Sequence, residues 1–332
     1  MDNFVNIALN SGGKFKPLLI PPSYMDGPSL TNPSVLTVGN RILVNIRNVN
    51  YTLYHAENNR FEHRWGPLSY IHPEHDLRLR TTNYLCLLDD NLDISSYSKV
   101  NTSLLDKEPL WEFVGLEDAR LIVWDNKMYL CGVRRDTTTT GVGRMELSEL
   151  RIESEFLTEG KLDTVHEISR FRIPAPNEVE YCNKNWMPLK SEPFTFVKWS
   201  NPVEVVKADP KTQTCSSILQ KKDILSDQKD WRGSSQVLST DEHYVCIVHE
   251  TDLYKSEAGN KDATYRHRFL VWDKNWNLVR KSRVFSFLDS KIEFCCGMDV
   301  YGDSVLITFG LEDNAAYIVS MPISRVEEFI YE

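Results

Sequence analysis

Residues 115–120 of the sequence read Gly-Leu-Glu-Asp-Ala-Arg and stand directly before an apolar run. An inverting displacement at a sugar carbon needs one acid or base beside the bridging oxygen and a second reactant on the opposite ring face. Asp118 fits the first role. A phosphate or nucleotide diphosphate as second reactant needs cationic side chains around it, whereas water needs a carboxylate base such as Glu293 or Glu250.

Charged side chains follow five apolar runs of the chain, at the point where each run ends. Such groups are costly to bury unless they have a partner or a function. If the five runs are strands around one axis, these ends converge at one mouth, and a mixed cationic and acidic mouth suits a sugar with a phosphate-bearing group. Solvated turns and structural ion pairs are the alternative for each position. The residues are Arg47, Arg134, Arg135, Lys198, His249, Glu250, Glu312 and Asp313.

The same runs belong to a recurring hairpin, in which a short β-rich run, a polar turn and a second apolar run follow one another. The units recur at intervals of about 50 to 85 residues, which is wide enough for one propeller blade each. One inner and one outer hairpin per unit would give four-stranded sheets, and their radial repetition protects the sheet edges. The hairpins span residues 35–46, 121–130, 186–197, 236–248 and 298–309.

The pattern therefore predicts an all-β chain, a single five-bladed β-propeller over residues 1–332 with few short helices. Two β-sandwiches are the rival architecture. Helical periodicity is weak, and the candidates are residues 142–153, residues 324–331 and a stretch near Asp163.

Composition argues against several classes of function. The 38 Lys and Arg residues against 47 Asp and Glu give a net charge of −9, so the basic footprint of a nucleic-acid binder is missing. No basic leader and no apolar stretch of about 20 residues occurs, so we expect neither secretion nor a membrane span, and a cytoplasmic location. Seven cysteines without metal-binding spacing predict reduced thiols, no metal site and no cofactor.

The segment 117–120 resembles the Glu-Asp-Pro-Arg signature of the β-mannoside phosphorylases, glycoside hydrolase family 130, whose members are five-bladed propellers. This chain has Ala119 in place of the proline. In that family the aspartate is the general acid and protonates the glycosidic oxygen through a sugar hydroxyl. The resemblance implies this role for Asp118 and places Glu117 and Arg120 among the substrate ligands.

Other motifs extend the resemblance on the sugar side. Asn32 and Arg47, fifteen residues apart, resemble the pair that holds the sugar next to the scissile bond. Asp313 resembles the late aspartate that binds sugar hydroxyls. Glu293, within residues 291–297, is either a further sugar ligand or a buried structural carboxylate.

On the phosphate side, Lys184 and Asn185 stand where phosphorylases carry an Arg-Asn contact. Arg232 lies near the position of a basic phosphate ligand, and His249 resembles the phosphate-binding histidine. A lysine at 184 removes a bidentate contact, and only Lys198 stands where a further arginine is expected.

These departures favour the related β-1,2-mannosyltransferases, which use a nucleotide-activated sugar and which the chain also resembles. Residues 265–269 could supply donor contacts through Tyr265, His267 and Arg268, with Arg134 as another cation. The alternative for this segment is an outer strand with solvated bases.

We therefore expect an enzyme that transfers a glycosyl unit, with mannosides or related glycans and a nucleotide-sugar as partners. The neighbouring alternative is a β-mannoside phosphorylase that uses inorganic phosphate. Hydrolysis would leave the cationic residues without a purpose. A carbohydrate-binding propeller without catalysis is the alternative from another class.

Overall fold

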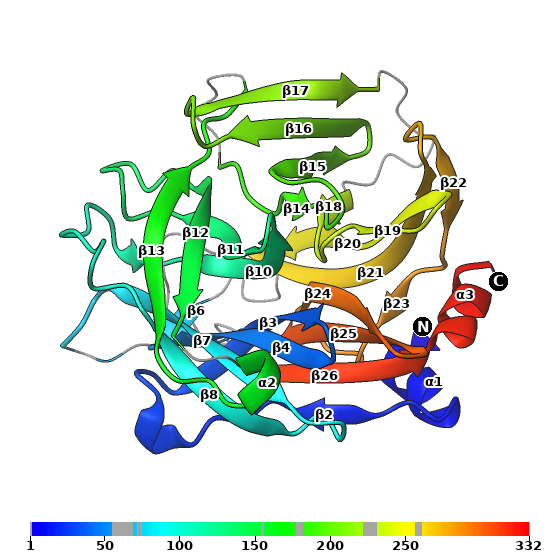
Figure 1. The fold of residues 1–332 in the computed structure, drawn as a ribbon, viewed down its shortest axis with the longest axis horizontal. Coiled ribbons are helices and arrows are strands. Elements are labelled where there is room, and N and C mark those ends of the chain that lie inside the picture. Colours follow the sequence, from blue (N-terminus) through cyan, green and yellow to red (C-terminus); the bar gives the residue numbers. More distant parts are fainter. Residues whose placement is uncertain are drawn as a thin grey trace.

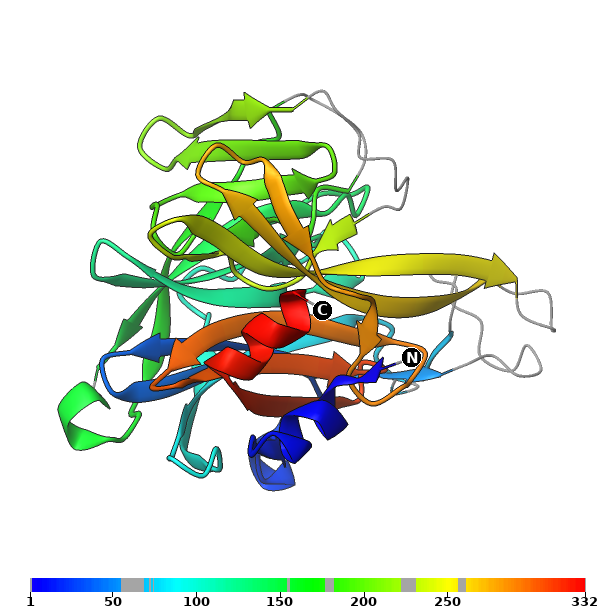
Figure 2. The same ribbon diagram turned by 90° about the vertical axis from the view of Figure 1, so that its right-hand side faces the viewer.

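Strands dominate the computed structural model, which describes residues 2–54, 69–71, 73, 75–153, 156–176, 182–221, 231–255 and 261–331. Within these ranges the helices are α1 (Phe4–Asn10), α2 (Phe156–Glu159), α3 (Ile323–Tyr331) and the 3-10 helix η1 (Pro22–Tyr24). The helices α1 and α3 lie near each other at the outer edge, close to the two chain ends (Figures 1 and 2). None of these helices has the length and apolar character that crossing a membrane requires.

The first half of the chain forms one nine-stranded sheet. Its first antiparallel set is β3 (Ser29–Val38), β4 (Arg41–Val49), β7 (Leu79–Leu88) and β8 (Ile94–Asn101). Its second set is β10 (Glu117–Trp124), β11 (Lys127–Arg134), β12 (Arg144–Ile152) and β13 (Val165–Arg172). A short parallel contact between β8 and β13 joins the two sets, and β9 (Phe113–Val114) pairs with β7.

The second half forms three sheets. The first is β14 (Met187–Pro188), β15 (Thr195–Ser200), β16 (Val203–Asp209) and β17 (Thr214–Gln220). The next contains β18 (Trp231–Gly233), β19 (Leu238–Ser239), β20 (His243–Lys255), β21 (Lys261–Asp273), β22 (Leu278–Lys281), β23 (Phe285–Ser286) and β1 (Asp2–Asn3). The last contains β24 (Glu293–Tyr301), β25 (Ser304–Leu311), β26 (Ala315–Pro322) and β2 (Phe15–Pro17), while β5 (Thr52–Tyr54) pairs with β6 (Ser69–Ile71) alone.

The sheets stand around a common centre, with β3, β10, β14, β18 and β24 nearest to it (Figure 1). The first strands of the chain, β1 and β2, pair with β23 and β26, so that the N-terminal segment joins the C-terminal sheets. This pairing closes the ring and covers edges that would otherwise be exposed.

Apolar side chains fill the spaces between neighbouring sheets. In β10, Leu121 packs with the β3–β4–β7 set, and the next residue, Ile122, packs with β15 and β16. In β3, Val35 and Leu36 divide in the same way between two clusters. Because successive residues of a strand point to opposite faces, a strand between two sheets is apolar on both. This explains why the sequence shows continuous apolar runs instead of strict alternation.

A polar side chain crosses the centre of the ring. Gln236 is 1% exposed, and its amide nitrogen donates to Ser34 Oγ (3.1 Å), Val35 O (2.9 Å) and Leu121 O (2.8 Å). Its oxygen accepts from Met298 N at 3.1 Å. One residue thus satisfies buried backbone groups of β3, β10 and β24, which have no ladder partner at this level.

Most of the expected elements are confirmed. The fold is mostly β, each predicted hairpin falls on a pair of consecutive strands, and residues 324–331 lie in α3. The helix expected at residues 142–153 is wrong, because β12 occupies this range. Met145 and Leu147 pack toward β15 and β16 and Leu150 toward β7, so burial on two faces imitates a helical pattern.

We predict that Gln236→Leu lowers the free energy of unfolding by about 2–4 kcal/mol, because it leaves the Met298 amide and two carbonyls buried without partners. Urea unfolding followed by tryptophan fluorescence measures the change. Gln220→Leu, at an exposed position at the end of β17, is the matched control and should change stability by less than about 0.5 kcal/mol. Equal effects of the two substitutions would contradict a role for Gln236 in joining the sheets.

Candidate active site

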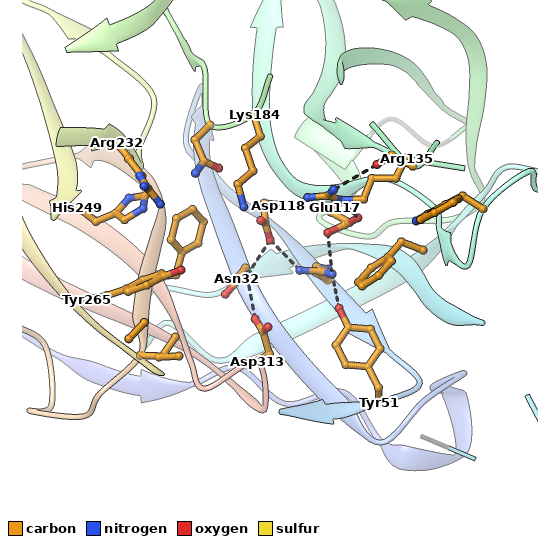
Figure 3. A pocket seen from close by; sticks show the side chains of 18 of the residues that line it. Asn32, Tyr51, Glu117, Asp118, Arg135, Lys184, Arg232, His249, Tyr265 and Asp313 are labelled. Atoms are coloured by element: carbon orange, nitrogen blue, oxygen red, sulfur yellow. Dashed lines mark hydrogen bonds and ion pairs between the residues drawn. The ribbon is translucent and has the colours of Figure 1, made fainter. Parts of the chain in front are cut away.

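A cavity of about 280 Å³ opens at the centre of the ring, where the innermost strands begin and their neighbours end (Figure 3). It collects eleven of the residues that the sequence nominated, from all the large sheets. They are Asn32, Arg47, Glu117, Asp118, Arg135, Lys184, Asn185, Arg232, His249, Tyr265 and Asp313. The expectation that separate stretches of the chain meet at one mouth therefore agrees with the geometry.

Four of these residues have left-handed backbone conformations. The φ angles are 45° for Asn32, 49° for Asp118, 61° for Asn185 and 48° for Asp313. Asn and Asp tolerate this region better than other residues with a side chain. In β3 and β10 the ladder shifts register here, between Thr31 and Ser34 and between Glu117 and Arg120. Such bulges redirect a side chain, and here they turn Asn32 and Asp118 toward the cavity.

Asn32 joins two carboxylates. Its amide nitrogen donates to Asp118 Oδ1 at 2.7 Å and to Asp313 Oδ1 at 3.3 Å. Thr31 Oγ1 donates to the Asn32 oxygen at 2.9 Å, which fixes the orientation of the amide. A Cβ atom at Gly310 would stand 2.1 Å from that oxygen, so the glycine provides the room for it. Asn32 is 4% exposed and therefore rigidly placed.

Arg47 is the cation at the bottom of the acidic group. Its Nη1 contacts Asp118 Oδ1 at 2.8 Å and its Nη2 lies 3.6 Å from Glu117 Oε2. Nε donates to Thr81 Oγ1 at 3.1 Å and Nη2 to the Tyr51 hydroxyl at 2.5 Å. The guanidinium is thus held on several sides by a carboxylate pair and two hydroxyls.

The two carboxyls beside Asn32 have opposite shifts. Burial alone would raise the pKa of Asp118, but Arg47 and the Asn32 amide outweigh it and hold this pKa below its ordinary value. Burial raises the pKa of Asp313, with a further contribution from the charge of Asp118 that Arg47 does not fully offset. Asp118 is therefore the ionised member of the pair, and Asp313 is the one that retains a proton more readily.

One end of the cavity is cationic. Lys184 and Arg232 point into it with Asn185, and the His249 ring stacks on Tyr265 with centroids 5.2 Å apart (Figure 3). Burial, together with nearby positive charge, lowers the pKa of His249 well below its ordinary value, so the ring is neutral. Its Nδ1 is 3.0 Å from Ser234 Oγ. This end can receive an anion through two cations and a neutral imidazole.

The other end of the cavity is aromatic, and the sequence analysis did not predict its three aromatic side chains. Tyr51, Trp111 and Phe113 line it together with Arg135, whose guanidinium lies 5.7 Å from the Phe113 ring centroid and 3.4 Å from Glu117 Oε1. Aromatic faces suit the C–H face of a sugar ring. Strand alternation was a signal for the choice between Arg134 and Arg135, since adjacent residues point to opposite sides, but no local pattern marked the three aromatic residues.

Arg120 and Glu293 do not line the cavity, which corrects the expectation that both face it. Arg120 is 1% exposed and lies beneath, where it donates to Asp118 O and Ser234 O, each at 2.8 Å. Glu293 is fully buried, and its carboxylate accepts from the backbone nitrogens of residues 287, 288 and 290. The structural alternative for Glu293 therefore agrees with its contacts.

The same correction applies to Arg134, His267 and Arg268. Arg134 faces away from the central cavity and pairs with Glu146 at 2.6 Å. His267 is fully buried and its Nε2 accepts from Cys295 N at 3.2 Å. Arg268 pairs with Glu250 at 2.5 Å. Alternation along β21 puts Arg268 on the face opposite to Tyr265. His267 shares the Tyr265 face, but its ring is buried against Phe285 and Phe287. The strand-end residues Lys198, Glu250 and Glu312 also lie outside the cavity lining.

Comparison with known proteins finds solved structures that share this fold. No family model and no curated protein matches the chain. Among solved structures, a β-1,2-mannobiose phosphorylase from Listeria innocua in complex with β-1,2-mannobiose is 13% identical, with a TM-score of 0.51 and coverage of 96% of this chain and 93% of that one. A mannose phosphorylase from Leishmania mexicana in complex with phosphate ion is 12% identical, with a TM-score of 0.51 and coverages of 98% and 94%.

A third structure comes from the GH130 family of mannoside phosphorylases, which contains glycoside hydrolases that target β-1,2 mannosidic linkages in Candida mannan. It is 12% identical, with a TM-score of 0.56 and coverages of 94% and 94%. At these identities the likeness is one of fold. The chain therefore shares the fold of mannoside phosphorylases and related glycoside hydrolases over nearly its whole length.

We predict that Asp313→Asn and Asp118→Asn change stability in opposite directions at pH 7. The raised pKa of Asp313 means that its ionisation disfavours the folded state, a cost present above the folded pKa and absent below the unfolded value near 4. Asp313→Asn should therefore raise the free energy of unfolding at pH 7 by about 1 kcal/mol, and the gain should shrink near pH 4.

The lowered pKa of Asp118 has the opposite sign: its ionisation stabilises the fold above about pH 4, and this contribution is lost as the pH falls through the folded pKa. Asp118→Asn should therefore lower stability at pH 7. Urea unfolding at both pH values measures the two variants. Changes of the same sign at pH 7 would contradict the assignment of the charge to Asp118.

Proposed function

We propose that the chain is a five-bladed propeller enzyme that cleaves a β-mannoside by inverting phosphorolysis, with Asp118 as its acid. The observation that carries this proposal is the order of groups in one cavity. Asp118 lies between a cationic end, with Lys184 and Arg232, and an aromatic end, with Tyr51. A sugar beside Asp118 would have room for an anion on one side and for a leaving sugar on the other.

The charged groups support phosphate as the second reactant. Lys184 and Arg232 offset its negative charge, and the neutral His249 ring donates from Nε2 when its Nδ1 accepts the Ser234 hydroxyl proton. Hydrogen-bond donors placed where charge arrives are the main protein contribution in such transfers. Asn185 adds an amide at the same end.

The proposed step needs no protein nucleophile. A phosphate oxygen forms a bond to the anomeric carbon as the bond to the glycosidic oxygen breaks, and the electron pair goes to that oxygen. The leaving oxygen takes a proton from Asp118 through a sugar hydroxyl. Because Asp118 is ionised in the empty cavity, the bound phosphate has a second effect: its negative charge raises the pKa of Asp118 toward that of an acid.

The volume of the cavity favours phosphorolysis over glycosyl transfer from a nucleotide-sugar, which is the opposite of the order expected from the sequence. About 280 Å³ is at the lower end of the range for ligand pockets and suits a sugar with a phosphate better than a sugar with a nucleoside diphosphate. His267 and Arg268, which the transferase hypothesis needed for the donor, lie outside the cavity lining. Two of the structures similar in fold are phosphorylases, with mannobiose or phosphate bound.

Hydrolysis is the second candidate, because the third structure belongs to a family that contains hydrolases. Water would need a carboxylate base on the side away from Asp118. Among the described lining residues the carboxylates are Glu117, Asp118 and Asp313, and none of them stands at the cationic end. The geometry therefore favours phosphate over water.

We predict that Asp118→Asn lowers kcat for the phosphorolysis of β-1,2-mannobiose by about 10²–10⁴-fold, because the acid is lost while the amide keeps the shape. Release of mannose 1-phosphate measures the rate. The control is Asp125→Asn, at an exposed turn of the same β10–β11 hairpin, which should retain the wild-type rate. A wild-type rate in Asp118→Asn would exclude the proposed acid, and binding of mannobiose without any turnover by the wild type would favour a binding protein.

We also predict that Arg232→Met raises KM for phosphate by about 10–100-fold, since one charge-assisted contact is lost, and changes KM for mannobiose much less. Arg280→Met, at an exposed position of β22 in the same sheet, is the control for removing one positive charge. Initial rates at varied phosphate concentration measure both variants. Sugar release that is independent of phosphate in the wild type would replace phosphorolysis with hydrolysis.

A further inference from the structure

A second cavity, of about 950 Å³, lies between the β7–β8 pair and strands β11–β13. It is more than three times as large as the central cavity and is separated from it by residues 114–118 of the chain, of which Val114, Gly115 and Leu116 line the second cavity and Glu117 and Asp118 the first. Its volume is within the range of small-molecule sites.

The cavity exists because the apolar layer between the two antiparallel sets fills only part of the space between them. Leu130 and Leu150 belong to that layer. On the same face of β11 and β12, however, the following positions are polar: Arg134, Ser148 and Glu146 all line the cavity. On this face, apolar side chains therefore close one end of the cavity, and buried polar side chains line the part that remains open.

Most of the buried charges in this wall are already paired. Arg134 Nε contacts Glu146 at 2.6 Å, and Arg170 Nη2 contacts Glu167 at 2.6 Å and Asp106 at 2.7 Å. Unpaired charges would be too costly at this depth, so these pairs are part of the fold. A ligand in the cavity would therefore find these charges already paired. Only a few other polar atoms of the wall are left to form hydrogen bonds with it.

Two such atoms have no partner among the described residues: Asp136 Oδ1 and Arg172 Nη1, both buried. Asp136 is 8% exposed, and its other oxygen accepts from Gly115 N at 2.9 Å. Burial lowers the pKa of Arg172 even though the charges of Glu146 and Asp136 act in the opposite direction. One acceptor and one donor thus stand in the same cavity and need a partner that can both donate and accept.

We propose that this cavity is a second binding site, for a neutral pyranose sugar whose hydroxyls bridge Asp136 and Arg172. A hydroxyl donates to the carboxylate oxygen and accepts from the guanidinium, which satisfies both without adding charge. The C–H face of the ring packs on the wall around Leu130 and Val100. An anion would satisfy Arg172 but would stand against the Asp136 and Glu146 carboxylates, so the neutral ligand fits better.

Methyl NMR of the full chain separates the two cavities in one titration. Val100 and Leu130 line the second cavity, and Ile292 lines the central one. In protein labelled at Ile, Leu and Val methyl groups, mannose and glucose are added in turn as probes. The choice of mannose rests on the proposed function, and the inference predicts a saturable shift at Leu130 and Val100 that is independent of Ile292.

Arg172→Met should weaken the binding seen at Leu130 by about tenfold or more, because one charge-assisted contact is lost. Arg151→Met, at an exposed position of β12 that lines neither cavity, removes the same charge and should leave this binding unchanged. Thr137→Trp, at the exposed rim, blocks the cavity without touching the buried ion pairs and should abolish the Leu130 shift if Arg172→Met does not fold.

The outcomes divide clearly. A shift at Ile292 alone would overturn the second site and leave the proposed function intact, whereas a shift at Leu130 alone would support the second site and count against sugar binding at the centre. A saturable shift at Leu130 with inorganic phosphate but with neither sugar would identify an anion site and overturn the proposal. No shift at Leu130 with any of the probes would likewise overturn the proposal.

Discussion

The central cavity depends above all on the cation of Arg47, which, with Arg135 at 3.4 Å from Glu117, allows three carboxylates to share a small space. Like charges that are partly removed from water raise each other's pKa values and destabilise the fold. Arg47 contacts Asp118 at 2.8 Å and Glu117 at 3.6 Å, and a guanidinium keeps its charge at every accessible pH. No ion pair joins it to Asp313, although both residues are described. The pair Asp118 and Asp313 is therefore asymmetric, and this asymmetry is what gives a carboxylate pair distinct chemical roles.

The position of Asp118 is in turn tied to the cationic end through Arg120. This side chain donates to the Asp118 carbonyl and to the Ser234 carbonyl, and the Ser234 hydroxyl contacts His249 Nδ1. The chain of contacts crosses from β10 to the segment after β18 beneath the cavity floor. A residue that sequence analysis placed among the substrate ligands thus holds both ends of the proposed site in register, which explains why a guanidinium is buried there.

Features that depend on local sequence could be predicted, whereas contacts between strands far apart in the chain could not. Asp118 could be predicted because it stands before an apolar run in a segment that resembles a known signature, and Asp313 because it follows such a run. Asn32 was nominated by the family resemblance. Which of Arg134 and Arg135 faces the central cavity could not be predicted, because it depends on which face of β11 packs against the neighbouring strands. Trp111 was not singled out for a related reason: its contact with Gly141, where a Cβ would stand 2.1 Å from the indole, joins two loops that no local pattern connects.

The alanine within residues 117–120 is a departure from the signature that the segment resembles, and β3 shows why the geometry tolerates it. In both strands two residues oppose one: Asn32 and Pro33 face Ile46, and Asp118 and Ala119 face Gly132. A bulge residue makes no regular ladder bond, so proline is accepted at 33 and is not required at 119. Asn45 Nδ2 donates to Ala119 O at 3.3 Å and supports the bulge from β4, in the other antiparallel set.

The lysine at 184 is a different kind of departure, because it changes what the side chain can bind. An ammonium is a point charge without the two parallel donors of a guanidinium, and Lys184 is exposed at the cavity rim. In the proposed reaction, directional contacts to phosphate would therefore come from Arg232, Asn185 and the His249 ring, which burial and the Ser234 contact hold in place. With a lysine at 184 there are fewer oriented donors, so the orientation of His249 would matter more than it would beside an arginine.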